Sequence, residues 1–420
     1  MILIRSAQII SPGSSKHLQT QDIRIREGKI TETGKALQAD GEKEIQSKNL
    51  CVSPGWIDLG PQFGDPGFEH REGLKSGLAA AAKGGFTAVA PFPNTDPVIH
   101  SKSEVEYLIN RSSGNIVSIL PIGALTRDNN GTDIAEMIDM HQAGAVAFSD
   151  GRNAVQRAGV VERALLYVLP FNGLIILRPE DETLSAGGQM NEGTVSTSLG
   201  LRGLPELSET IAVTRDVTLL EYTGSRLLEF GVSSPESISL IKAAKKAGQK
   251  AYSSMNSYQF YFTDEDLSGF DTNLKVKPCL RSPKDVEQFK KAFLAGDIDI
   301  ISSGHEPWDE EQKKVEFLYA EPGMASIELS YSILNTALGK DSDQEKIVQS
   351  LAINTREILG QESSQIEEGQ KADITLFDPA AKWTVQESDL LSNGVNNPFI
   401  GKELTGKVLG IINEQQSQFA

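Results

Sequence analysis

Apolar and polar residues alternate at both ends of the chain. The stretches ILIRSAQII (2–10) and DIRIREGKI (22–30) repeat with period two and are separated by turn residues. The same pattern returns in ADITLFDP (372–379), WTVQE (383–387) and GKVLGIIN (406–413). These short strands predict one small β-sandwich domain built from both termini, residues 1–53 together with 368–420.

Between these ends, apolar runs of strand length alternate with amphipathic helical stretches. Eight runs fit strands: GWIDLG (55–60), FTAVAPFP (86–93), IVSILPIGAL (116–125), AVAFSD (145–150), LIILRPED (174–181), RLLEFGVS (226–233), KAYSSMNS (250–257) and DIDIISSGHEP (297–307). Four helical stretches end in glycine, a common helix stop: 74–85, 133–144, 235–248 and 283–296. This alternation predicts an α/β fold with a (β/α)₈ TIM-like barrel over residues 54–367.

Polar residues follow the predicted barrel strands, where enzymes of this architecture carry their chemistry. In chain order the strand ends offer Asp58, Asn94, Asp150, Glu180 with Asp181, Ser233, Asn256 and His305. The chain has five histidines, and among them only His305 is expected in this rim. Because neighbouring residues of a strand point to opposite faces, Glu180 and Asp181 are not expected to act as a pair.

Composition narrows the classes of partner. The net charge of −17 and the pI near 4.9 disfavour nucleic acid and anionic membranes as partners. Cys51 and Cys279 lie far apart and show no zinc-ribbon spacing, which favours two reduced thiols. The N-terminus lacks the apolar run of a signal peptide, and no stretch approaches ~18 apolar residues. We therefore expect a soluble, cytoplasmic protein.

Motifs along almost the whole chain resemble those of the dihydroorotases of the amidohydrolase superfamily, in the family's order. The resemblance rests on segments that include PGWID (54–58), DPGFEHRE (65–72), AFSDG (147–151), KPCLRSPKD (277–285), GHEPWDEEQK (304–313) and NPFIGKELTGKV (397–408). It implies an amidohydrolase-type barrel and a hydrolase that closes carbamoyl aspartate to dihydroorotate in pyrimidine synthesis. It also implies a zinc ion that polarises the ring carbonyl and generates hydroxide.

The sequence departs from this family at most positions that carry the chemistry. The family's first strand carries Asp-x-His-x-His, and here Asp58 is followed by Gly60 and Gln62. Further positions at which the resemblance implies a metal ligand, a catalytic aspartate or a substrate-binding residue are Gly64, Arg178, Gly231, Gly304, Trp308 and Lys277. Only Asp150 remains at a metal-ligand position, and only Asn94 at a side-chain substrate position. The sequence thus predicts a degenerate metal site and no zinc.

Alternatives remain for the residues that are retained. Structural roles are favoured for Asp58, Asp150 and His305. For Asn94, the favoured role is to fix its turn. A weak zinc site could combine Asp150 and His305 with Glu180 or Asp181. A further hypothesis pairs Arg178 with Asp150 in place of the metal.

Three functions are compatible with this pattern. The first is a catalytically inactive dihydroorotase homologue that acts as a structural or regulatory partner, for example of aspartate carbamoyltransferase, within a homo- or hetero-oligomer. The second is an active dihydroorotase or cyclic-amide hydrolase with an atypical metal site, which would use zinc. The third is a sensor in which Arg178 and Lys277 bind a small anionic pyrimidine precursor.

Overall fold

The two chain ends form one eight-stranded sheet in the computed structural model, which describes residues 1–419. The sheet has the order β19-β18-β17-β5-β1-β2-β3, and β4 pairs with β1. Its strands are β1 (Ile2–Ile9), β2 (Thr20–Arg26), β3 (Lys29–Gly34), β4 (Lys43–Ile45), β5 (Cys51–Pro54), β17 (Asp373–Thr384), β18 (Glu403–Asn413) and β19 (Gln416–Phe419). The antiparallel pairing of β5 with β17 joins the N-terminal to the C-terminal strands.

This sheet curls back on itself, where the sequence predicted a sandwich of two sheets. The backbone N–H of Ile30 donates to the carbonyl of Gln370 at 3.0 Å, and that of Ala372 donates to Gly28 at 2.8 Å. These bonds bring β3 next to the start of β17. Ile4, Ile25 and Ile374 consequently share one buried core. The single curled sheet encloses its apolar side chains as two facing sheets would, and the boundaries of the domain stay a prediction.

All eight predicted strands of the middle region are present, and they pair in parallel. They are β6 (Trp56–Leu59), β7 (Phe86–Ala90), β8 (Ser118–Ile119) with β9 (Ile122–Gly123), β10 (Ala147–Phe148), β11 (Ile175–Leu177), β14 (Arg226–Glu229), β15 (Lys250–Asn256) and β16 (Ile300–Ser302). The third predicted strand is split into β8 and β9 because Pro121 has no N–H for a ladder bond. The pairing runs β6-β7-β8 and β9-β10-β11-β14-β15-β16, which confirms the α/β class.

Helices connect these strands. The longer ones are α1 (Leu74–Lys83), α2 (Lys102–Ser112), α4 (Ala158–Val168), α7 (Leu207–Thr223), α8 (Pro235–Lys246), α9 (Pro283–Ala295) and α11 (Ser330–Leu338). The shorter ones are α3 (Met137–Gln142), α5 (Glu182–Ser185), α6 (Thr194–Leu199), α10 (Glu310–Lys313), α12 (Gln344–Val348) and α13 (Asn354–Ile358), and a two-stranded ribbon of β12 (Met190–Asn191) and β13 (Gly203–Leu204) lies between α5 and α7. Helix α9 shows why such stretches fold locally: Ser282 caps its start, Pro283 occupies the first turn, and Gly296 ends it in a left-handed conformation. Among the helices of residues 1–419, none has the length and hydropathy to cross a membrane.

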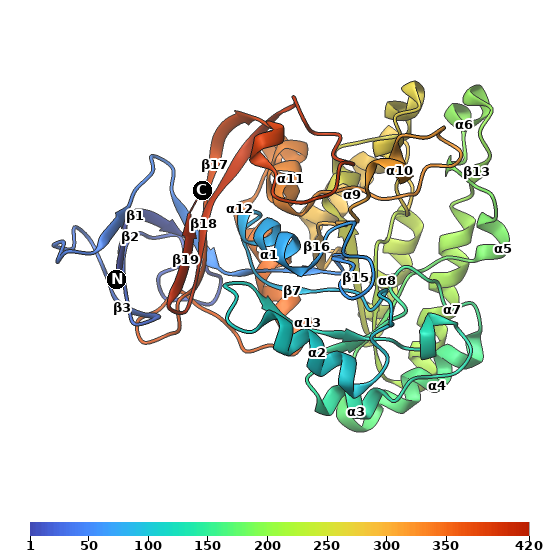
Figure 1. Cartoon of the computed structure of the whole chain (residues 1–420), viewed down its shortest axis with the longest axis horizontal. Helices are drawn as coiled ribbons and strands as arrows, with labels where there is room; N and C mark the ends of the chain where they lie inside the picture. Colours follow the sequence, from blue (N-terminus) through green and yellow to red (C-terminus); the bar gives the residue numbers. More distant parts are fainter. Residues whose placement is uncertain (420) are drawn as a thin grey trace.

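The parallel strands and the terminal sheet share an aromatic core. The indole of Trp56 on β6 lies 5.1 Å from the ring of Tyr331 and 5.4 Å from that of Phe377 on β17. The guanidinium of Arg356 donates to the carbonyl of Gly55 at 2.9 Å and also contacts the carboxylate of Asp373. In Figure 1 the terminal sheet lies at one side of the molecule and α5, α6 and β13 lie at the other.

Candidate functional site

Asp58 joins the first parallel strand to the last. Its side chain is fully buried at the end of β6, and it accepts hydrogen bonds from the backbone N–H of Ser303 at 2.7 Å and from the Ser303 hydroxyl. Burial raises the pKa of Asp58 to about 6. Because both of its oxygens bond to the segment after β16, the carboxylate fixes the two strands to each other.

Asp150 makes an equivalent contact on the other side of the site. Its carboxylate accepts hydrogen bonds from the backbone N–H of Thr126 at 2.8 Å and from the Thr126 hydroxyl. Burial raises the pKa of Asp150 to about 6. The hypothesis that Arg178 pairs with Asp150 is wrong, because Thr126 satisfies both carboxylate oxygens and the Arg178 guanidinium lies against Glu180.

Asn94 links two loops through its side-chain amide. Its Nδ2 donates to the carbonyl of Asp150 at 3.0 Å, and its Oδ1 accepts from the backbone N–H of Arg152 at 2.9 Å. The amide thus holds the loop after β7 against the loop after β10.

His305 is buried and held on both sides of its ring. Its Nδ1 accepts from the backbone N–H of Ser326 at 3.1 Å, and its Nε2 lies 3.4 Å from the Glu72 carboxylate. Burial raises the pKa of Glu72, but contacts with His305 and Ser392 outweigh this effect and leave the pKa below its usual value. His305 therefore helps to fix the loops after β16, with the Glu72 carboxylate beside its Nε2.

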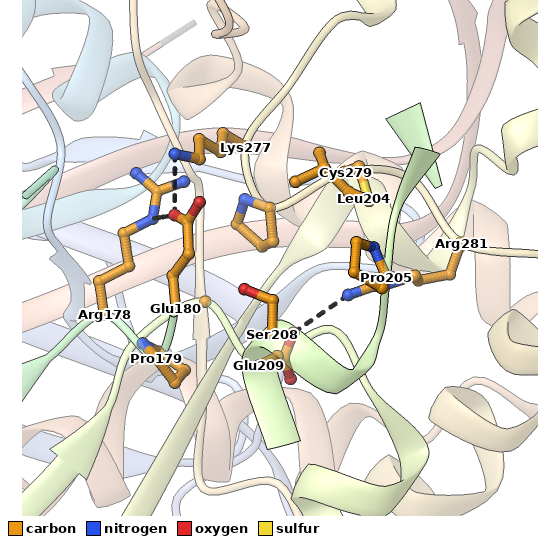
Figure 2. A pocket seen from close by; sticks show the side chains of 12 residues that line it. Arg178, Pro179, Glu180, Leu204, Pro205, Ser208, Glu209, Lys277, Cys279 and Arg281 are labelled. Carbon is orange, nitrogen blue, oxygen red and sulfur yellow. Dashed lines mark hydrogen bonds and ion pairs between the residues drawn. The ribbon is translucent and has the colours of Figure 1, made fainter. Parts of the chain in front are cut away.

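Arg178, Lys277 and Glu180 form a compact charged group. The sensor hypothesis placed Arg178 and Lys277 together around an anion, but the sequence did not predict that Glu180 would be their partner. Figure 2 shows both cationic side chains directed at Glu180. Lys277 Nζ lies 2.8 Å and Arg178 Nε 3.8 Å from Glu180 Oε2, and the Ser185 hydroxyl donates to Glu180 Oε1 at 2.5 Å. Burial raises the pKa of Glu180, and the two cations more than compensate, so that its pKa is lowered. Asp181 points elsewhere and caps α5 through the backbone N–H groups of Thr183 and Leu184.

The remaining strand ends also make internal hydrogen bonds. The Ser233 hydroxyl donates to Glu209 at 2.5 Å, and the buried Arg281 guanidinium donates to Ser233 at 3.0 Å. Figure 2 shows Arg281 and Glu209 on the opposite wall of a small cavity from Lys277. Asn256 donates to the Tyr258 hydroxyl at 2.9 Å and accepts from the Ser302 hydroxyl at 2.8 Å.

Large side chains fill the space beside the glycines that stand where ligands were expected. A Cβ atom on Gly60 would lie 2.5 Å from the ring of Phe92 and 2.9 Å from that of Phe230, and Gly60 has a φ of +78°. The two rings pack edge to face with centroids 4.7 Å apart. A Cβ atom on Gly304 would lie 2.6 Å from both Asn256 and Tyr258.

A small cavity lies at the centre of the site. It measures about 20 Å³, and its lining includes Gly60, Gln62, Arg178, Lys277 and Gly304. That volume holds about one water molecule, whereas pockets for small organic ligands measure roughly 300–1,000 Å³. Gly231, at another expected ligand position, lies beside Pro278.

The residues present do not fit a zinc ion. A catalytic zinc needs three converging protein ligands and an open position. Asp58, Asp150 and His305 each bond to neighbouring segments, and within residues 1–419 no three His, Cys, Asp or Glu side chains are grouped as a metal site. The other histidines lie elsewhere: His17 near Glu345, His70 near Asp309, His100 near Asp128, and His141 stacked on Phe171. Cys51 and Cys279 are buried as free thiols, and burial raises the pKa of both.

The identity of the residues that fill the site could not be predicted from the sequence. Phe92, Phe230 and Tyr258 belong to runs whose apolar character suits any buried strand end. Thr126 and Glu72 are far in the sequence from the residues that they contact. A glycine at an expected ligand position was the one available indication that a neighbour must occupy its space.

Comparison with known proteins identifies relatives over nearly the full chain. Residues 49–237 match the family described as Dihydro-orotase-like. The chain is 38% identical to a protein of Pelotomaculum thermopropionicum named Dihydroorotase, across 96% of this chain and 95% of that protein. It is also 38% identical to the Dihydroorotase of Caldicellulosiruptor saccharolyticus, across 98% of this chain and 97% of that protein.

Solved structures show the same fold at low sequence identity. The L-hydantoinase (dihydropyrimidinase) of Arthrobacter aurescens aligns with a TM-score of 0.86 and 20% identity, over 99% of this chain and 95% of that chain. A D-hydantoinase (dihydropyrimidinase) from Thermus sp. aligns with a TM-score of 0.80 and 21% identity, over 100% and 96% of the two chains. These similarities extend across both the terminal sheet and the parallel strands.

Proposed function

Because the chain belongs to the dihydroorotase-like family, we propose that it is a member that has lost the hydrolytic reaction and serves pyrimidine biosynthesis as a structural or regulatory partner of another protein. One observation carries this proposal: apart from Asp150, the expected metal-ligand positions lack the family's ligand groups, and neighbouring side chains fill the space at Gly60 and Gly304. Phe92 and Phe230 pack against Gly60, and Tyr258 packs against Gly304.

The preserved scaffold supports a role that needs the fold without the reaction. Asp58 and Asp150 retain buried, hydrogen-bonded positions that fix the ends of β6 and β10. We extend the proposal to a closed eight-stranded barrel, since the bonds from Ser303 to Asp58 bring β16 to β6 and the hydantoinase-like structures align over the whole chain.

The proposed partner is aspartate carbamoyltransferase, the enzyme that precedes dihydroorotase in the pathway implied by the resemblance. A catalytically silent barrel can stabilise or regulate such a partner through its surface alone. The assembly would be a hetero-oligomer, with homo-oligomers of this chain as a component.

Co-expression and co-purification with the aspartate carbamoyltransferase of the same organism test the proposal. We expect a complex that survives gel filtration and a transferase whose thermal stability or allosteric response changes when the chain is present. Two separate elution peaks, with transferase properties identical with and without the chain, would contradict the partner role.

A working dihydroorotase is the second candidate, and the 36–38% identity to proteins named Dihydroorotase favours it. It requires a metal site assembled from residues that now hold the loops together, such as Asp150 and His305. Metal analysis of the purified protein distinguishes the two candidates: one or two equivalents of zinc retained after gel filtration would support the enzyme.

A sensor for an anionic pyrimidine precursor is a weaker proposal. A carboxylate ligand would have to displace Glu180 from Lys277 and enlarge the central cavity. Thermal stabilisation by millimolar carbamoyl aspartate or dihydroorotate would support it, and an unchanged melting temperature would reject it.

A further inference from the structure

Four apolar side chains are exposed on the loops that follow β15 and β16. The exposed fractions are 44% for Phe270, 40% for Val315, 52% for Leu318 and 74% for Tyr319. The two loops adjoin, because the Phe270 ring packs edge to face on Phe317 at 6.0 Å and the Thr272 hydroxyl donates to the carbonyl of Lys313 at 2.7 Å. We call Phe270, Val315, Leu318 and Tyr319 the apolar patch.

Two buried lysines hold the loop that carries this patch. Lys275 Nζ donates to the carbonyls of Phe317 and Leu318 at 2.8 and 3.0 Å. Lys313 Nζ donates to the carbonyls of Glu321 and Gly323 at 2.8 and 3.2 Å, and burial lowers the pKa of Lys313 to about 8. Bonds of this kind order the loop before any partner arrives, which reduces the entropy lost on binding.

The segments that carry the apolar patch are rich in exposed carboxylates. The patch lies on residues 264–274 and 309–323, and the one cationic side chain exposed on these two segments is Lys314. Lys314 pairs with Glu310 at 2.6 Å. The exposed carboxylates of these segments include those of Glu265, Asp271, Glu310, Glu311, Glu316 and Glu321. Nucleic acid, an anionic membrane and the same face of a second copy would all be repelled by these carboxylates.

We infer that the apolar patch is the docking surface for a partner protein that presents an apolar centre within a basic rim. The inference rests on the proposed partner role, and it identifies the surface through which this chain would bind its partner. The patch lies beside α10, at the end of the molecule away from β1, β2 and β3 (Figure 1). Docking there leaves the terminal sheet uncovered.

The test compares two double variants of the full chain with matched exposure. Leu318→Ser with Tyr319→Ser removes the centre of the patch, and Leu207→Ser with Tyr222→Ser removes residues of 54% and 73% exposure from α7. Binding of purified aspartate carbamoyltransferase is measured by titration calorimetry. We expect the patch variant to bind at least about tenfold more weakly, the α7 variant to match the parent, and affinity to fall with added salt.

The other outcomes separate failure of the docking surface from failure of the proposed partner role. Equal binding by all three proteins would overturn the docking surface and leave the proposed function standing. If the parent does not bind the transferase, the proposed partner fails, and a synthetic amphipathic helix of leucine and lysine becomes the probe. Equal affinity of the patch and α7 variants for that helix would then overturn the inference, whereas a roughly tenfold loss in the patch variant alone would support it.

Sedimentation of the parent, the patch variant and the α7 variant without a partner tests whether a second copy of the chain covers the apolar patch. We expect the same oligomeric state for all of them. An oligomer that dissociates only in the patch variant would assign this face to a second copy of the chain and overturn the inference.

Discussion

At the scale of single residues, two buried carboxylates hold neighbouring loops together through hydrogen bonds. Asp58 and Asp150 each direct both oxygens at donors of a neighbouring loop. The sequence predicted that these two residues favour structural roles. It could not predict Ser303 and Thr126 as their partners, because such contacts depend on how distant loops meet after folding.

Asp150→Asn should change the pH dependence of stability. The pKa of Asp150 is raised from 3.8 to about 6, so the protonated carboxyl stabilises the folded state fully below pH 4, and this contribution is lost as the pH rises through 6. Asparagine can keep hydrogen bonds to Thr126 and does not ionise. Urea unfolding should therefore show the variant gaining about 3 kcal/mol relative to the parent between pH 4 and pH 7. A difference that is constant with pH would contradict the burial of this carboxylate.

Gly60→Ala should destabilise the chain more than Gly248→Ala. Both glycines have positive φ, +78° and +86°, but only at Gly60 would a Cβ meet other atoms, the rings of Phe92 and Phe230. The shared backbone strain costs about 1–2 kcal/mol, and overpacking at Gly60 should add about 1–3 kcal/mol. Chemical denaturation measures both variants. Equal losses would mean that the rings do not fill the expected ligand position.

At the scale of elements, hydrophobic periodicity predicted all eight parallel strands and the helices over 74–85, 235–248 and 283–296. These segments are set by local patterns: apolar runs, capping residues and glycine stops. The curled terminal sheet was not predictable in the same way. Alternation identifies strands, whereas the hydrogen bonds from Ile30 and Ala372 that curl the sheet depend on partners far along the chain.

Phe377→Ala should test how firmly the terminal sheet is attached. Phe377 is fully buried on β17 and packs between Trp56 and Tyr331. Truncating a buried phenylalanine costs about 3–5 kcal/mol. Phe270→Ala, at a position 44% exposed, is the control and should cost about 1 kcal/mol or less. Similar losses in denaturant titrations of the two variants would mean that the sheet is not anchored through this cluster.

At the scale of the whole molecule, the chain keeps the dihydroorotase-like fold over nearly its full length, and the cavity at the centre of the site measures about 20 Å³. Family membership followed from motifs spread along the chain, and the 38% identity to named dihydroorotases agrees with it. The sequence also led to the prediction that the metal site is lost, because Gly60 and Gln62 stand where the resemblance implies two imidazoles. The aromatic filling and the charged group around Glu180 required the structure, since they involve residues from several strand ends.

Whether the chain has lost the hydrolytic reaction is measured by hydrolysis of dihydroorotate by the purified protein with added zinc. The Asp150→Asn protein, prepared identically, controls for dihydroorotase contributed by the expression host. We predict the same background rate in both preparations, because under the proposed function neither protein binds a catalytic metal. Turnover of about 1 per second or more in the parent, lost in the variant, would contradict the account and show that Asp150 serves an active metal centre.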